Sequence, residues 1–253
     1  MPVFEDENLD SAVSALQKII DGGGRTVFFG GAGVSTESGI PDFRSMDGLY
    51  HQKWRFPPER ILCHDFFYSE TAEFYRFYRE KLLVSGVQPN PAHRKLAELE
   101  QAGKLECVIT QNIDGLHQAA GSRNVLELHG STLRNYCTGC GAFYDADFIR
   151  RSASAENGIP RCTECGAPVK PDVVLYGEPL DQKTLEASVR AISAAGTLII
   201  GGTSLSVYPA AGLVDYFSGK NLVLINKTAS ACDSAAALVI HAPIGKILGA
   251  VRV

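Results

Sequence analysis

The segment from Thr26 to Arg44 limits the possible folds of this chain more than any other. The β-branched and aromatic run Thr26–Phe29 predicts a short buried strand, and closely spaced glycines follow it directly. Such glycines let the backbone approach a pyrophosphate, whose charge the exposed amides of a following helix N-terminus can hold. A tight turn without a ligand is the simpler explanation, but the preceding strand favours a nucleotide site in an α/β fold.

The glycine spacing departs from the dinucleotide-binding motif of dehydrogenases. Gly31 and Gly33 match that motif, but Thr36 stands where its third glycine belongs, and Pro41 would end a helix after about two turns. No acidic residue ends a second strand about 20 residues later, where such enzymes bind the ribose. The polar, irregular residues 35–50 instead predict a mobile loop beside the site. The segment therefore predicts a nucleotide site that differs from that of an NAD-dependent oxidoreductase, and an oxidoreductase remains only as an alternative.

Two further apolar runs end in polar residues that suit a nucleotide site. Cys107–Thr110 predicts a strand that runs into Gln111–Asp114, and Val125–Leu128 predicts a strand that ends at His129. In open α/β sheets, ligands bind at the C-terminal ends of the strands. We therefore expect amide, carboxylate and imidazole groups to gather at the edge that carries the glycine turn.

Four of the seven cysteines form two Cys-x-x-Cys pairs with the spacing of a zinc site. The pairs are Cys137 with Cys140 and Cys162 with Cys165, and 21 residues separate them. Four thiolates leave zinc no open coordination position, so we expect one structural ion that staples a small module. Two redox dithiols are the alternative, which is disfavoured because neither pair opens a thioredoxin-like βα unit.

Length and composition agree with one large domain that carries a small insertion. The chain has 253 residues, of which 45% are hydrophobic and 21% charged. Its net charge of −4 provides no general attraction to nucleic acid, so we expect no direct nucleic-acid binding. The first residues lack a basic and apolar signal segment, and no apolar run reaches membrane-spanning length. These features favour a cytoplasmic protein without membrane contacts.

The alternation of helical and strand patterns predicts an α/β fold: a Rossmann-like, mostly parallel sheet with helices on both faces, plus a smaller insertion that combines a zinc ribbon with helices. Helices are expected at 9–20, 66–84 and 90–102, and helical or loop segments near 181–194 and 209–217. Beyond the cysteine pairs, short strands are expected at 173–176, 197–200, 222–225 and 238–240.

The large, nucleotide-binding domain is expected to be discontinuous. It comprises residues 1–44, 89–131 and 170–253, while 45–88 form a helical insertion with the cofactor loop and 132–169 form the zinc-binding module. The active site is then expected in the cleft between these parts.

The motifs of this chain occur in the order seen in sirtuins. From about Leu9 to the C-terminus, the chain resembles that family of NAD-dependent protein-lysine deacylases. The resemblance implies a deacetylase that transfers the acyl group of acetyl-lysine to ADP-ribose and releases nicotinamide, with NAD as co-substrate and acylated-lysine proteins or peptides as partners. A non-catalytic NAD or ADP-ribose sensor is a further alternative. The matching segments are 31–44, 110–114, 128–130, the two cysteine pairs and 202–205.

The resemblance also assigns roles to individual residues. His129 matches the general base, an imidazole with a pKa suited to that task. The catalytic set is His129, Asn112 and Asp114. The cofactor set is Gly31, Ala32, Gly33, Thr36, Phe43, Arg44, Gln111, Asn112, Ile113, Asp114, Gly202, Thr203, Ser204, Asn226 and Lys227. The substrate set is Val173, Val174, Tyr176, Gly177, Glu178 and Val207.

Two departures from the family pattern concern the acyl group. Tyr176 stands where Phe is common, which adds a phenol to the proposed acyl-lysine tunnel. Sirtuins that prefer succinyl-lysine carry a Tyr-x-x-Arg motif, but here Tyr78 follows Tyr75 at that spacing. An acidic acyl group would then be buried without a cation. We therefore expect a preference for neutral short acyl groups.

Overall fold

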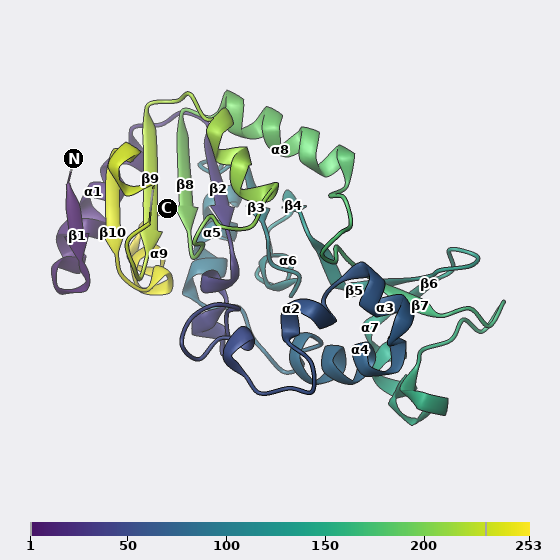
Figure 1. The fold of residues 1–253 in the computed structure, drawn as a ribbon. Helices are drawn as coiled ribbons and strands as arrows, with labels where there is room; N and C mark the ends of the chain where they lie inside the picture. Colours follow the sequence, from purple (N-terminus) through teal and green to yellow (C-terminus); the bar gives the residue numbers. More distant parts are fainter. Residues whose placement is uncertain (1, 231) are drawn as a thin grey trace.

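A parallel sheet forms the larger part of the molecule. The computed structural model describes residues 2–230 and 232–253. Within them, the strands of this sheet run in the order β1-β10-β9-β8-β2-β3-β4, every neighbouring pair being parallel (Figure 1). The strands are β1 (Val3–Glu5), β2 (Thr26–Gly30), β3 (Cys107–Thr110), β4 (Val125–Glu127), β8 (Thr197–Gly201), β9 (Asn221–Asn226) and β10 (Leu238–His241).

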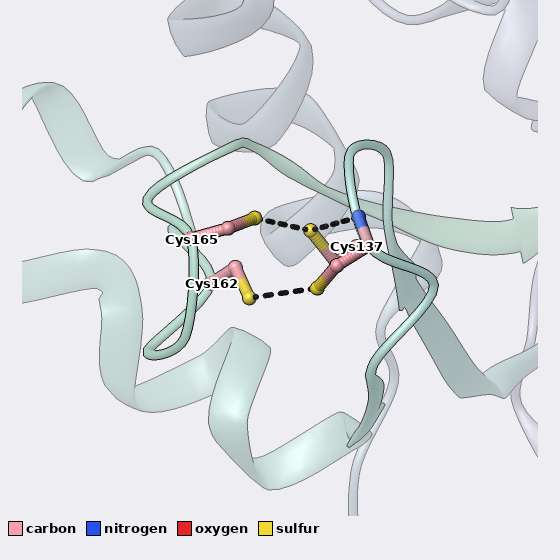
Figure 2. Close-up of side chains that lie close together, drawn as sticks. Cys137, Cys162 and Cys165 are labelled. Carbon is pink, nitrogen blue, oxygen red and sulfur yellow. Dashed lines mark hydrogen bonds between the residues drawn. The ribbon is translucent and has the colours of Figure 1, made fainter.

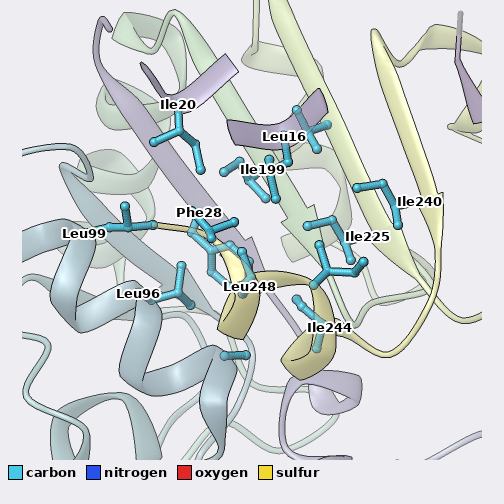
Figure 3. Packing of buried hydrophobic residues seen from close by; sticks show 14 of the residues in the cluster. Leu16, Ile20, Phe28, Leu96, Leu99, Ile199, Ile225, Ile240, Ile244 and Leu248 are labelled. Atoms are coloured by element: carbon cyan, nitrogen blue, oxygen red, sulfur yellow. The ribbon is translucent and has the colours of Figure 1, made fainter. Parts of the chain in front are cut away.

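Helices cover both faces of this sheet, because successive strand residues point to opposite sides and both sides are apolar. Phe28 and Ile199 face one side, where they meet Leu16, Leu96 and apolar residues of the last helix (Figure 3). The predicted α/β class is therefore confirmed. One face carries α1 (Leu9–Asp21), α5 (Pro91–Gln101) and α9 (Ile244–Ala250), and the other carries α8 (Gln182–Ala194) and the 3₁₀ helix Ala210–Tyr216.

A smaller part packs around its own aromatic core. Phe67, Phe74, Tyr75 and Tyr78 are fully buried in this core and contact one another edge to face or stacked. The antiparallel sheet β6-β5-β7 lies beside it. The elements are α2 (Pro58–Ile61), α3 (His64–Ser69), α4 (Thr71–Phe77), a π-helical turn (Tyr78–Leu82), β5 (Gly130–Cys137), β6 (Phe143–Asp145), α7 (Ala146–Arg151) and β7 (Val169–Val173).

The expected single helix over 66–84 is wrong, since the chain breaks at Glu70 (φ −130°, ψ 44°) between α3 and α4. Two hydroxyls flank the break: Ser69 Oγ donates to the Asp65 carbonyl (2.8 Å) and Thr71 Oγ1 donates to the Phe67 carbonyl (2.7 Å). Side-chain hydroxyls thus occupy carbonyls that a continuous helix would use, which favours a break.

The expected strand at 173–176 is also misplaced. The strand is β7, which ends at Val173 and pairs antiparallel with β5 outside the parallel sheet. Its alternating burial is typical of an antiparallel strand with one covered face, whereas β2 and β8 in the middle of the parallel sheet are buried at every residue. Strands β1, β5 and β6 and helix α9 were not expected from the sequence. Within the described residues, no helix combines the length and apolarity needed to span a membrane.

Candidate active site

The glycine turn after β2 lies against the loop that follows β8. Gly33 N–H donates to the Gly202 carbonyl (2.8 Å), and a Cβ on Gly33 would lie 2.8 Å from the Gly202 Cα. A Cβ on Gly31 would lie 2.8 Å from the Thr203 Cβ. Side chains at these positions would push the two loops apart, so the glycines are needed for the close approach.

The turn is followed by two short 3₁₀ helices, Ala32–Val34 and Thr36–Ser38, and not by a long helix. Gly39 ends the second one in the left-handed region (φ 89°), just before Pro41. This geometry confirms that the segment differs from the first βα unit of a dehydrogenase, as the position of Pro41 predicts.

Polar side chains connect the ends of three strands of the parallel sheet, β3, β8 and β9. Gln111, after β3, donates from Nε2 to Thr203 Oγ1 (3.0 Å), and the Thr203 N–H donates to Asn226 Oδ1 (3.0 Å) at the end of β9. The sheet thus brings together at one edge residues that lie more than a hundred positions apart in the chain. This is the edge at which open α/β sheets bind ligands.

Ser35 joins the two polar residues expected to form the core of the site. Its hydroxyl donates to Asp114 Oδ2 (2.6 Å) and accepts from Asn112 Nδ2 (3.0 Å). The second carboxylate oxygen of Asp114 accepts from the Leu116 N–H (2.9 Å). Ser35 was missed in the sequence analysis, although a polar residue directly after the glycine turn was an available signal. The carboxylate is therefore held in one orientation from both sides.

His129 lies just beyond β4, with its ring beside the same strand ends. Its Nδ1 lies 3.0 Å from the Gln111 carbonyl. That carbonyl can only accept, so Nδ1 carries the proton and Nε2 is the basic nitrogen. Burial lowers the pKa of His129 below its usual value, and the hydrogen bond to Gln111 opposes the shift. The imidazole is thus neutral at pH 7, as a general base must be.

The segment after β7 lies beside His129 and is tied to the smaller part. The Val174 N–H donates to the His129 carbonyl (3.0 Å). Tyr176 donates from its N–H to the Leu62 carbonyl (2.8 Å) and accepts at its carbonyl from the His64 N–H (2.9 Å). The proposed acyl-lysine residues and the proposed base are therefore adjacent.

Glu178 holds this segment in place through its carboxylate. Oε2 accepts from the Leu175 N–H (2.9 Å) and Lys170 Nζ (3.0 Å), and Oε1 lies 2.9 Å from His64 Nδ1. Burial alone would raise the pKa of Glu178, but these hydrogen bonds lower it below the ordinary value. The carboxylate is thus engaged within the protein, while the backbone next to Gly177 (φ 91°) forms a turn.

The four paired cysteines form one cluster (Figure 2), with all four sulfur atoms within 4.8 Å of one another. Cys137 Sγ lies 3.4 Å from Cys165 Sγ, and Cys140 Sγ lies 3.5 Å from Cys162 Sγ. The Gly139 N–H points at the Cys137 sulfur (3.3 Å), which stabilises a thiolate. Four convergent sulfurs held by backbone amides fit a tetrahedral zinc ion with no open position.

Comparisons with known proteins agree with this geometry. A family model for the Sir2 family matches residues 31–209. The chain belongs to the Sir2 family. It is 57% identical to an NAD-dependent protein deacetylase of Clostridium perfringens over 96% of this chain and 99% of that protein. It is 53% identical to one of Cutibacterium acnes over 90% of this chain and 92% of that protein.

Solved Sir2 structures share the fold of this Sir2-family chain. A Sir2 variant with a deacetylated p53 peptide and 3′-O-acetyl-ADP-ribose has a TM-score of 0.88 and 37% identity, and covers 93% of this chain and 95% of its own. Sir2 with a p53 peptide and NAD⁺ has a TM-score of 0.84 and 38% identity, with the same coverage. These neighbours and the four-cysteine cluster match the fold class expected from the sequence.

In this Sir2-family chain, several residues of the expected cofactor set do not contact the polar network of Gln111, Thr203 and Asn226. Phe43 and Arg44 both lie against Tyr50, the first edge to face at 5.5 Å and the second with its guanidinium 5.7 Å from the ring centre. The remaining members of the cofactor set are placed as follows: Thr36 Oγ1 donates to the Gly33 carbonyl, Ser204 Oγ shares a hydrogen bond with Ser206 Oγ, the Ile113 carbonyl accepts from Thr132, Ala32 opens a 3₁₀ turn, and Lys227 is exposed. In the expected substrate set, the Val207 carbonyl accepts from the Ala211 N–H.

His117, which follows the Gln111–Asp114 segment, does not belong to the polar network. It is buried, packs against Phe28 and His93, and neither ring nitrogen has a hydrogen-bond partner among the described residues. Burial lowers its pKa to about 3. His117 is therefore a neutral core residue and His129 is the histidine at the strand ends.

Proposed function

We propose that this chain is an NAD-dependent protein deacetylase, which transfers the acetyl group of acetyl-lysine to ADP-ribose and releases nicotinamide. The observation that carries the proposal is the arrangement at the strand ends: a neutral imidazole and a fixed carboxylate lie beside a glycine turn. Curated relatives up to 57% identical are named NAD-dependent protein deacetylases. Neighbouring solved structures contain NAD⁺, acetylated peptide or acetyl-ADP-ribose.

The residues present fit a bound NAD molecule. The glycine turn at Gly31 and Gly33 lies directly against the loop at Gly202 and Thr203, because a Cβ on either glycine would clash with that loop. Gln111, Thr203 and Asn226 form one polar network at these two loops, where donors and acceptors suit ribose and phosphate groups. We assign them to the ribose and phosphate groups, and we assign Asn112, Ile113 and Asp114 to the nicotinamide. NAD supplies the cleavable bond between nicotinamide and ribose.

His129 supplies the proton transfer in the proposed mechanism. Nδ1 donates to the Gln111 carbonyl, so Nε2 is free to take a proton from a ribose hydroxyl. The Asp114 carboxylate cannot rotate without breaking its bonds to Ser35 and the Leu116 N–H, so it presents one fixed negative edge. Preorganised groups of this kind avoid the cost of reorientation during the reaction.

The peptide is proposed to bind as a strand between Gly177–Glu178 and the segment around Val207. Its acyl-lysine would enter along Val173, Val174 and Tyr176, next to the base. Backbone pairing tolerates many sequences, so this mode recognises the acylated side chain more than its neighbours.

A neutral acyl group fits the charges around the proposed tunnel. Tyr78 is fully buried in the aromatic core of the smaller part. Arg76 pairs with Glu73 (2.6 Å), and Arg79 donates to the Gly158 carbonyl (2.6 Å). Both arginines, one in α4 and one in the π-helical turn after it, line an open groove that residues 153–158 border on the other side. We therefore propose that acetyl-lysine is preferred over succinyl-lysine, whose carboxylate would have no arginine from α4 to pair with.

We also propose the division into an NAD-binding domain (1–44, 89–131 and 170–253), a helical insertion (45–88) and a zinc module (132–169). The proposed location is the cytoplasm. All seven cysteines are free thiols in the structure, as expected in a reducing compartment where four of them can bind zinc.

An assay with NAD and an acetyl-lysine peptide tests the proposed function. We expect nicotinamide, deacetylated peptide and acetyl-ADP-ribose in equal amounts. NAD binding without nicotinamide release would instead support the sensor alternative. Formation of reduced nicotinamide cofactor would support the oxidoreductase.

A further inference from the structure

Two phenol hydroxyls join the loop that follows the glycine turn to the proposed acyl-lysine tunnel. Tyr50 Oη lies 2.5 Å from Tyr176 Oη, a hydrogen bond between residues 126 positions apart in the chain. Tyr50 lies in the short 3₁₀ helix Leu49–His51, and Tyr176 lies in the segment after β7. A phenylalanine at position 176 could not form this bond, because it has no hydroxyl.

Tyr50 is attached on its other side to both proposed cofactor residues of the loop. Its N–H donates to the Phe43 carbonyl (2.9 Å), its ring meets the Phe43 ring edge to face, and the Arg44 guanidinium lies over it. The Leu49 N–H donates to the Asp42 carbonyl (2.8 Å). Residues 42–50 therefore form a closed loop in which a shift of Tyr50 carries Phe43 and Arg44 with it.

Tyr176 has a fixed backbone and a partly free side chain. Its N–H and carbonyl are held by Leu62 and His64, as described above, while 40% of its surface is exposed. An acyl-lysine placed along this segment would restrict the Tyr176 ring directly. Because the two hydroxyls share a hydrogen bond, a Tyr176 ring with less freedom to move would also limit the movement of Tyr50.

We propose that the Tyr50–Tyr176 hydroxyl pair is a latch that couples binding of acyl-lysine to binding of NAD. This inference rests on the proposed function, since it takes NAD and acyl-lysine as the two ligands. With the tunnel filled, the latch holds the 42–50 loop in place, so NAD no longer has to order Phe43 and Arg44. One hydrogen bond of ordinary net strength corresponds to a coupling factor of about 3- to 10-fold in affinity.

The latch can be tested with variants that each remove one hydroxyl and keep the ring: Tyr50→Phe, Tyr176→Phe and the double variant. Tyr216→Phe is the matched control, because Tyr216 is an exposed tyrosine that belongs to neither the proposed cofactor set nor the proposed substrate set. Calorimetry measures the dissociation constant of carbocyclic NAD, which cannot release nicotinamide, with and without an acetyl-lysine peptide. Trp54, the one tryptophan of the chain, packs against Phe77 outside the loop, so its fluorescence checks that each variant keeps the native fold.

We expect the peptide to tighten binding of carbocyclic NAD about 3- to 10-fold in the wild type and in Tyr216→Phe, but by a factor near one in either single latch variant. The double variant should match the single variants, because one bond is lost in each case. An unchanged coupling factor, or single effects that multiply in the double variant, would overturn the latch alone. Absence of carbocyclic NAD binding in the wild type would overturn the latch together with the proposed function.

Discussion

Ser35 provides the sharpest test of how the site is built, because it is 1% exposed and contacts both Asp114 and Asn112. Ser35→Ala removes the donor to Asp114 Oδ2 and the acceptor of Asn112 Nδ2. A buried hydrogen bond to a charged group contributes about 1.5–3 kcal/mol, and an unsatisfied buried amide costs about 1–3 kcal/mol. Some of this cost is recovered by water, so we expect the free energy of unfolding to fall by about 2–4 kcal/mol.

The same change should also impair the proposed reaction, since the Asp114 carboxylate would retain only its bond to the Leu116 N–H. If the less constrained carboxylate loses about 1.4–2.8 kcal/mol of transition-state stabilisation, kcat/KM for nicotinamide release falls 10- to 100-fold. The matched control is Ser122→Ala. Ser122 is also buried, but its hydroxyl has no hydrogen-bond partner among the described residues, so its removal should cost little. A Ser35→Ala enzyme with wild-type kcat/KM would refute this account of the site.

The remaining predictions concern the base, the metal, the acyl group and the buried histidines. His129→Ala should lower deacetylation by ~10²–10⁴-fold while NAD affinity stays near that of the wild type, and near-wild-type turnover would exclude His129 as the base. Metal analysis should find one zinc per chain, and chelation should unfold the smaller part; a chain that stays folded and active without zinc would contradict a structural ion. On matched peptides, kcat/KM should be higher for acetyl-lysine than for succinyl-lysine, and the reverse order would refute the charge argument. Burial lowers the pKa of His93 to about 4 and of His117 to about 3, so between those values and about 6.5 the unfolded chain binds more protons than the folded chain. Stability should therefore fall as the pH drops through this range, less steeply in His117→Gln, and a flat profile would contradict neutral burial.

Helix α5 and the break at Glu70 show where sequence reasoning succeeded and failed. The Asn90–Pro91 pair predicts the start of α5, and the structure confirms it with a capping box between Asn90 and His93. The break at Glu70 was missed because it lies within a run that has helical periodicity, and the two hydroxyl bonds that flank and favour it have no distinct sequence signal. A local sequence signal is reliable when one side chain caps one backbone group, as Asn90 does. It is weak when side-chain hydroxyls and backbone amides compete for the same carbonyls, as they do near Glu70.

The amino-acid sequence by itself determined the class of fold, the four cysteines that cluster and the identity of the polar residues at the strand ends. These features depend on short spacings that physical chemistry limits strongly: a glycine turn after a strand, or two Cys-x-x-Cys pairs. Only the tertiary structure decided that Ser35 holds Asp114 and that Tyr50 meets Tyr176. Such pairs join segments 79 and 126 positions apart: the first meets just beyond the paired ends of β2 and β3, and the second meets where the loop at residues 42–50 contacts the segment after β7. A short sequence pattern does not predict these contacts, because they depend on residues that are close in space but distant in the sequence.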